Sequence, residues 1–152
     1  MQVDRWKLFV AFAAMCAAGV VMGEDRHGTD PVVTSVAALC ARSEKMDGAR
    51  VRIHGIVRTD RRHLILLLDA VHAKVGISLV VPPLLRQQAS GARLMRAVFT
   101  PPSRGHDKIV HGTFIGRFAS APRSAGGRSL TLEKADDLSV EELAREEAGI
   151  SK

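Results

Sequence analysis

The chain has 152 residues, 46% of them hydrophobic, which suits one domain with a modest core and excludes a large multidomain protein. The formal net charge is +6, which favours acidic partners. The 16 Arg and 6 Lys are spread along the whole sequence, which excludes a single basic tail. Aromatic residues make up only 4% of the chain, so few rings are available to stack on a ligand.

The first 23 residues have the pattern of a secretory signal peptide. Arg5 and Lys7 form a short cationic region, and an uncharged apolar run follows over residues 8–22. This run is shorter than the ~20 residues that a transmembrane helix needs. We therefore expect export to the periplasm or beyond the cell, with cleavage after Gly23. If the segment is not cleaved, it anchors the protein in the membrane.

The two cysteines carry different expectations. Cys16 lies inside the apolar run and raises lipid modification as an alternative, although the preceding residues "AAM" fit a lipobox poorly. Removal of the signal peptide leaves Cys40 as the one cysteine of the mature chain, which excludes an internal disulfide. Cys40 is at helical spacing from Val36 and Ala37, so we expect a buried, inert thiol.

The mature chain is predicted to begin with a flexible leader over residues 24–33. Ser35 can cap a short helix that runs to Ala41, and the turn Asp47-Gly48 leads into a strand with alternating apolar residues. The polar "TDRR" joins this strand to the next as a hairpin. Strands are predicted over residues 49–57, 63–69, 74–81, 109–118 and 128–135.

The middle of the chain is less regular. In the strand over residues 74–81, the alternation directs Val75, Ile77, Leu79 and Val81 inward, and Pro82-Pro83 ends the strand. Residues 84–102 have helical spacing that Ser90-Gly91 interrupts, so this segment is left open as helix or loop.

The C-terminal segment carries a helix-start pattern. Ser139 is followed three residues later by Glu142, which matches a capping box. The pattern predicts a short acidic helix through Ala148, within a fraying tail over residues 139–152.

Glycines within the strands complete the fold prediction. Gly55, Gly112 and Gly116 permit the sharp bends by which strands close a small barrel. The predicted fold is mainly β: a five-stranded Greek-key barrel over residues 34–138, with a short N-terminal helix, an irregular or helical connection between the third and fourth strands, and a short C-terminal helix.

This pattern resembles the OB-fold and, more narrowly, a family of uncharacterised bacterial OB-like proteins. Their outline is a capped helix, an E-K-x-D-G turn, an alternating V-x-V-x-G strand and a later V-x-G-x-F strand. The corresponding segments here are "SVAALCARSEKMDG", "VRIHGIV" and "IVHGTF", followed by a closing "GRSLTLEKADDL". The resemblance covers residues 34–138 except for 84–102, and it implies an OB-like fold without assigned catalytic residues.

Basic residues on and beside the first and fourth predicted strands are the candidate binding residues. An OB-fold suggests single-stranded nucleic acid as a ligand, but that function needs exposed aromatic rings as well as a basic groove. Phe114 and Phe118 are expected in the core, so nucleic acid is kept as an alternative. The candidate binding residues are Arg50, Arg52, His54, Arg58, Arg61, Arg62, His111 and Arg117.

Metal binding is the other alternative. His54 and His111 each precede a glycine, on strands that are neighbours in an OB barrel, so they could lie close together on its outer face. The sequence contains no H-x-x-H or H-E-x-x-H pair of the kind that zinc sites use, and we expect no metal ligands.

No catalytic motif is present. The sequence has no G-x-S-x-G, no P-loop and no G-x-G-x-x-G, so we expect neither catalytic residues nor a cofactor. The sequence instead favours a non-catalytic module that binds a protein, an anionic envelope polymer or a second copy of itself. The loops expected to carry recognition span residues 58–62, 82–108 and 119–127.

Overall fold

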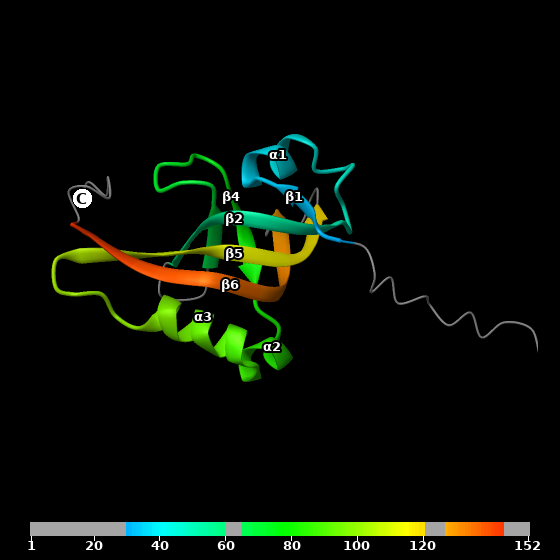
Figure 1. Ribbon diagram of the computed structural model, residues 1–152. Helices are drawn as coiled ribbons and strands as arrows, with labels where there is room; N and C mark the ends of the chain where they lie inside the picture. The colour runs from blue at the N-terminus through cyan, green and yellow to red at the C-terminus, as the bar shows by residue number, and fades with distance from the viewer. Residues whose placement is uncertain (1–29, 60–64, 121–126, 145–152) are drawn as a thin grey trace, which may run out of the picture.

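Figure 1 shows the computed structural model, which describes residues 30–59, 65–120 and 127–144. The expected signal peptide, its cleavage site after Gly23 and Cys16 lie outside these residues. The described elements, in chain order, are β1 (Val32–Thr34), α1 (Val36–Ala41), β2 (Arg50–Thr59), β3 (Ile65–Leu68), β4 (Gly76–Val80), α2 (Pro83–Gln87), α3 (Ala89–Phe99), β5 (His106–Ser120) and β6 (Arg128–Ala144).

The protein is mainly β, and its six described strands form one sheet in the order β1-β2-β3-β4-β6-β5. An additional antiparallel pairing of β2 with β5 closes β2 to β6 into a ring of hydrogen-bonded strands. Within the ring, β4 and β6 pair parallel, and the other neighbours pair antiparallel. The helices α2 and α3 connect β4 to β5, and α3 lies along β6 (Figure 1).

The sheet has one strand more than the five expected, because the end of the expected flexible leader forms β1. Residues Val32–Thr34 pair in parallel with Val51–Ile53 of β2. β3 pairs with the same edge of β2 only from Ile56 onward, so the first half of that edge is available to β1. The backbone groups of β2 over 51–53 thereby gain partners that β3 does not supply.

The main hydrophobic core is formed by alternate residues of the ring strands. Phe114 and Phe118 are fully buried in it, as the alternation predicted. Ile77, Leu79 and Val81 are also buried as expected. Val75 was expected inward but is 43% exposed, because it precedes β4, which begins at Gly76.

Helix α1 is capped from two directions. The side-chain oxygen of Ser35 accepts from the Ala38 N–H at 3.1 Å, which confirms the predicted N-cap. Asp69, at the end of β3, accepts from the N–H groups of Val36 and Ala37 at 2.6 and 2.8 Å. Asp69 thus satisfies two of the donors that a helix start leaves without intrahelical partners. Cys40, expected to be buried, is half-buried and packs against the main core.

We expect Asp69→Ala to lower the free energy of unfolding by about 1–2 kcal/mol, because two helix N–H groups lose their acceptor. Urea denaturation followed by circular dichroism measures this loss. Glu44→Ala removes a carboxylate from an exposed residue in the turn after α1 and is the matched control. Equal losses in the two variants would contradict a capping role for Asp69.

The segment left open between the third and fourth predicted strands is helical. It forms two helices that meet at Gln88, the C-cap of α2 and the N-cap of α3. The interruption expected at Ser90-Gly91 lies inside α3 instead. Leu85, Leu94 and Val98 pack these helices against the main core.

The predicted C-terminal helix is wrong over the described residues, because β6 continues as a strand from Arg128 to Ala144. Ser139 and Glu142 pair with His111 and Lys108 of β5. Leu143 packs against a second apolar cluster of Ile56, Leu68 and Ile109, which an isolated helix would not reach. Hydrogen bonds from Ser103 are the main cause that lowers the pKa of Glu142. The Glu142 carboxylate therefore accepts from the loop before β5 instead of capping a helix.

Gly55 and Gly112 lie opposite each other on β2 and β5. A Cβ atom on Gly55 would lie 2.5 Å from the Leu68 carbonyl oxygen, at the point where the partner of β2 changes from β1 to β3. A Cβ on Gly112 would lie 2.7 Å from the Leu138 side chain. Both glycines therefore permit a close approach of neighbouring backbone or side chain.

Candidate binding surface

Three of the candidate arginines form one cluster on the outer face of the sheet. Arg50 and Arg52 alternate on β2 with the buried Val51 and Ile53, so they point away from the core. Arg117 of β5 is in register with Arg50. We call Arg50, Arg52 and Arg117 the arginine strip.

Glu133 of β6 joins two members of the strip. Its Oε2 lies 2.6 Å from Nε of Arg50, and its Oε1 lies 3.4 Å from Nε of Arg117. The side chains of Arg50, Glu133 and Arg117 are 33%, 33% and 42% exposed, so the pairs add little to stability. Glu133 thus holds two of the three guanidinium groups of the strip in place.

His54 belongs to a polar network next to the strip. The hydroxyl of Thr113, whose residue is only 5% exposed, donates to Oδ2 of Asp137 at 3.2 Å. The hydroxyl oxygen of Thr113 also lies 3.0 Å from Nδ1 of His54. Because the hydroxyl proton points to the carboxylate, Nδ1–H of His54 donates to the Thr113 oxygen.

Asp137 owes its position to a bulge in β6. The register shifts between His111 and Thr113, so that Asp137 and Leu138 together oppose Gly112. Asp137 has φ 52°, in the left-handed region that aspartate tolerates better than most residues. The bulge therefore turns the carboxylate of Asp137 toward Thr113.

His54 and His111 are not cross-strand partners. His54 is in register with Thr113, and His111 with Ile56. Nε2 of His111 lies 2.7 Å from Oε2 of Glu141 on the neighbouring strand β6. Both histidines nevertheless line one open depression of about 320 Å³, together with Gly55, Ile56, Asp69, Gly112 and Asp137. Within the described residues, no group of three or more His, Cys, Asp or Glu side chains is arranged to hold a metal ion.

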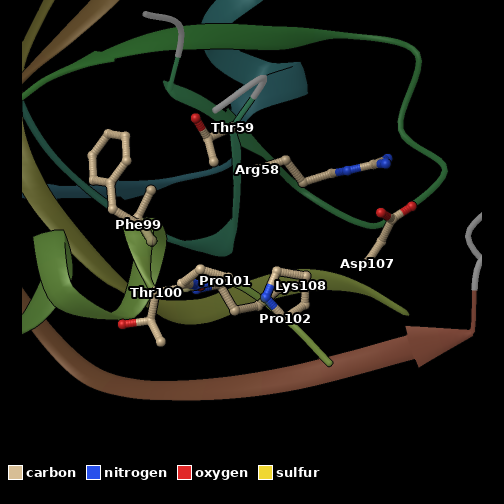
Figure 2. A pocket seen from close by; sticks show the side chains of 9 residues that line it. Arg58, Thr59, Phe99, Thr100, Pro101, Pro102, Asp107 and Lys108 are labelled. Carbon is tan, nitrogen blue, oxygen red and sulfur yellow. The ribbon is translucent and has the colours of Figure 1, made fainter. Parts of the chain in front are cut away.

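Arg58 lines a different cavity, of about 190 Å³, at the end of α3 (Figure 2). Nη1 of Arg58 donates to the Val71 carbonyl at 3.4 Å. We call this cavity the Phe99 pocket. It is lined by Arg58, Thr59, Val98, Phe99, Thr100, Pro101, Pro102, Asp107 and Lys108.

Of the nine residues that line this pocket, Arg58 was a candidate binding residue from the sequence. Phe99, Asp107 and Lys108 fall within residues 82–108, which were expected to carry recognition, but they were not singled out. A signal for Phe99 was present, because the buried stripe of α3 runs through Leu94 and Val98 and leaves Phe99 off it. Phe99 is accordingly 46% exposed. No signal in the sequence places Asp107 and Lys108 beside it, since β5 reaches the end of α3 only in the folded chain.

The remaining predicted recognition residues are only partly described. Arg61 and Arg62 lie outside the described residues, as does most of the loop over 119–127.

No helix within residues 30–59, 65–120 and 127–144 has the length and hydropathy to cross a membrane. Comparison of the chain with models of known protein families and with curated proteins gave no match.

Proposed function

We propose that the protein is an exported, non-catalytic binding module with an OB-like β-barrel fold. The fold proposal is supported by the ring order β2-β3-β4-β6-β5 and by the position of α2 and α3 between the third and fourth ring strands. The OB-fold is a five-stranded, partly open Greek-key barrel, and β1 is then an addition to it. Export rests on the signal-peptide pattern of residues 1–23.

The proposed ligand is an anionic polymer of the cell envelope, and the arginine strip is its binding surface. The observation that carries this proposal is the bridge from Glu133 to Arg50 and Arg117. Guanidinium groups bind carboxylate, phosphate and sulfate in a fork geometry, and a side chain that is already oriented loses less entropy on binding. Arg52, exposed two residues further along β2, extends the positive surface.

The test is fluorescence anisotropy of the purified protein with labelled dextran sulfate, and with uncharged dextran as the blank. We expect Arg52→Glu to weaken binding about tenfold or more, because a hydrogen bond to a charged group contributes about 1.5–3 kcal/mol. Arg93→Glu makes the same charge change on an exposed position of α3 and is the control. If both variants weaken binding equally, net charge rather than the strip attracts the polymer, and the proposal fails.

The nucleic-acid alternative is tested in the same assay with a labelled oligodeoxythymidylate. Stacking on aromatic rings supplies about 1–3 kcal/mol per base to such complexes. The rings of Phe114 and Phe118 are fully buried, so neither can supply it at the strip. We expect the oligonucleotide to bind more weakly than dextran sulfate, and tighter binding would favour the alternative.

A further inference from the structure

The open depression that His54 and His111 line, which we call the histidine depression, is continuous with the arginine strip. On β2, Arg52 and His54 are exposed on either side of the buried Ile53, so both point to the outer face of the sheet. Two residues of a strand span roughly 7 Å. β5, which carries His111, lies beside β2 (Figure 1). A ligand that extends along β2 from the strip therefore passes over the depression.

The histidine depression offers polar groups that are already held in position. Nδ1 of His54 contacts the Thr113 hydroxyl, and Nε2 of His111 contacts the Glu141 carboxylate. Within the described residues, the other nitrogen of each ring has no hydrogen-bond partner. The Thr113 hydroxyl donates to Oδ2 of Asp137, so Oδ1 of this carboxylate is also available to a ligand among the described residues. A hydroxyl group suits such a mixture, because it both donates and accepts.

The charges around the depression disfavour a charged group inside it. Asp69 and Asp137 both line it. Their contacts are with the N–H groups at the start of α1 and with the Thr113 hydroxyl, so neither carboxylate faces a cation in the part of the chain that the structure describes. An anion would be repelled by these carboxylates, and a cation by Arg52 of the adjoining strip. The depression, of about 320 Å³, therefore fits an uncharged group with several hydroxyls.

We propose that the histidine depression binds an uncharged sugar unit of the same polymer whose acidic units pair with the arginine strip. The ligand is thus an acidic polysaccharide in which charged and uncharged sugars alternate, and this inference rests on the proposed function. The hydroxyls of the uncharged sugar bind the ring nitrogens of His54 and His111 and the carboxylate of Asp137. A polymer with a charge on every unit, such as a polyphosphate, would instead place an anion beside Asp69 and Asp137.

The experiment compares two labelled polymers by fluorescence anisotropy at about pH 8, where imidazole groups are ordinarily uncharged. Hyaluronan fragments alternate a carboxylated sugar with an uncharged one, whereas dextran sulfate carries sulfate groups along its whole length. We expect His54→Ala to weaken hyaluronan binding about fivefold or more, and dextran sulfate binding by less than about twofold, because only the uncharged sugar loses hydrogen bonds. His72→Ala removes an imidazole from an exposed position outside the depression and is the matched control.

Asp137→Gly provides a second test, in which a sugar subsite and a merely electrostatic surface predict opposite signs. Glycine adopts the positive φ of this position without strain, so the bulge is retained. Loss of the negative charge should strengthen dextran sulfate binding, because the repulsion of its sulfate groups falls. The same change should weaken hyaluronan binding about threefold or more, because the sugar loses an acceptor.

The outcomes separate this proposal from the proposed function. Dextran sulfate binding by His54→Ala shows that the variant is folded. The sugar subsite fails if hyaluronan does not bind, if His54→Ala binds it as the wild type does, or if Asp137→Gly strengthens the binding of both polymers. The arginine strip still stands in each of these cases when Arg52→Glu weakens dextran sulfate binding more than Arg93→Glu does. If these two arginine variants are equal, the proposed function fails first and the subsite with it.

Discussion

Replacing Phe114 by alanine is expected to lower the free energy of unfolding by about 3–5 kcal/mol. Phe114 is fully buried, and it is in register with Ile53 of β2 and Ala135 of β6. Its removal loses the transfer free energy of the ring and leaves a cavity that three hydrogen-bonded strands cannot collapse to fill. Since a domain of this size is stable by only about 5–15 kcal/mol, the variant should lose a large share of its stability.

Urea denaturation monitored by circular dichroism measures this effect. Phe99→Ala is the matched control, because it makes the same chemical change at a partly exposed position on α3. We expect the control to lose about 1 kcal/mol or less. If Phe114→Ala also lowers the free energy of unfolding by only this amount, the side chain of Phe114 is not buried as the register of β5 requires.

The strands of the ring were predictable because their apolar residues alternate. Val51 and Ile53 of β2, and Phe114 and Phe118 of β5, are buried at the positions that a period of two assigns to the core. The strand bounds were less predictable. β5 extends to His106, where the side chains are polar and the ladder to β6 supplies the backbone partners.

The C-terminal helix was predicted from a local sequence pattern, but pairing with β5 makes the segment a strand instead. Ser139 and Glu142 fit a capping box within four residues of sequence. Pairing with β5 offers the same backbone groups a ladder, and the second apolar cluster buries Leu143. A capping pattern carries no information about either interaction, because Ser139 and Glu142 pair with His111 and Lys108, which lie 28 and 34 positions earlier in the chain.

The candidate site was predictable in residue type but not in arrangement. The arginines of β2 were identified from their alternation, yet their grouping with Arg117 depends on the register between β2 and β5. Glu133 was not identified at all, since an acidic residue in a late strand has no sequence link to Arg50. The two histidines line one depression, but the register gives each a different hydrogen-bond partner.

Gly91 shows how a tertiary contact can reverse a local propensity. It lies within α3, where an exposed glycine would be less favourable than alanine by about 1 kcal/mol. Propensity alone therefore predicts that Gly91→Ala stabilises the protein. However, a Cβ atom built on Gly91 would lie 1.9 Å from the carbonyl oxygen of Leu85 in α2. Real Cβ atoms do not approach oxygen this closely, so the junction of the two helices would have to open.

We therefore expect Gly91→Ala to lower the free energy of unfolding by about 2–3 kcal/mol, because the overpacking cost exceeds the gain in helix propensity. Leu85 is itself part of the main core, so α2 cannot shift without losing that burial. Thermal and urea unfolding of Gly91→Ala and of Ser90→Ala measure the difference. The neighbouring serine already has a Cβ atom, so its replacement by alanine adds no atom and should change stability by about 0.5 kcal/mol or less. A stabilised Gly91→Ala protein would contradict the close packing of Gly91 against the Leu85 carbonyl. It would also show that the angle between α2 and α3 at Gln88 can change to accommodate a methyl group.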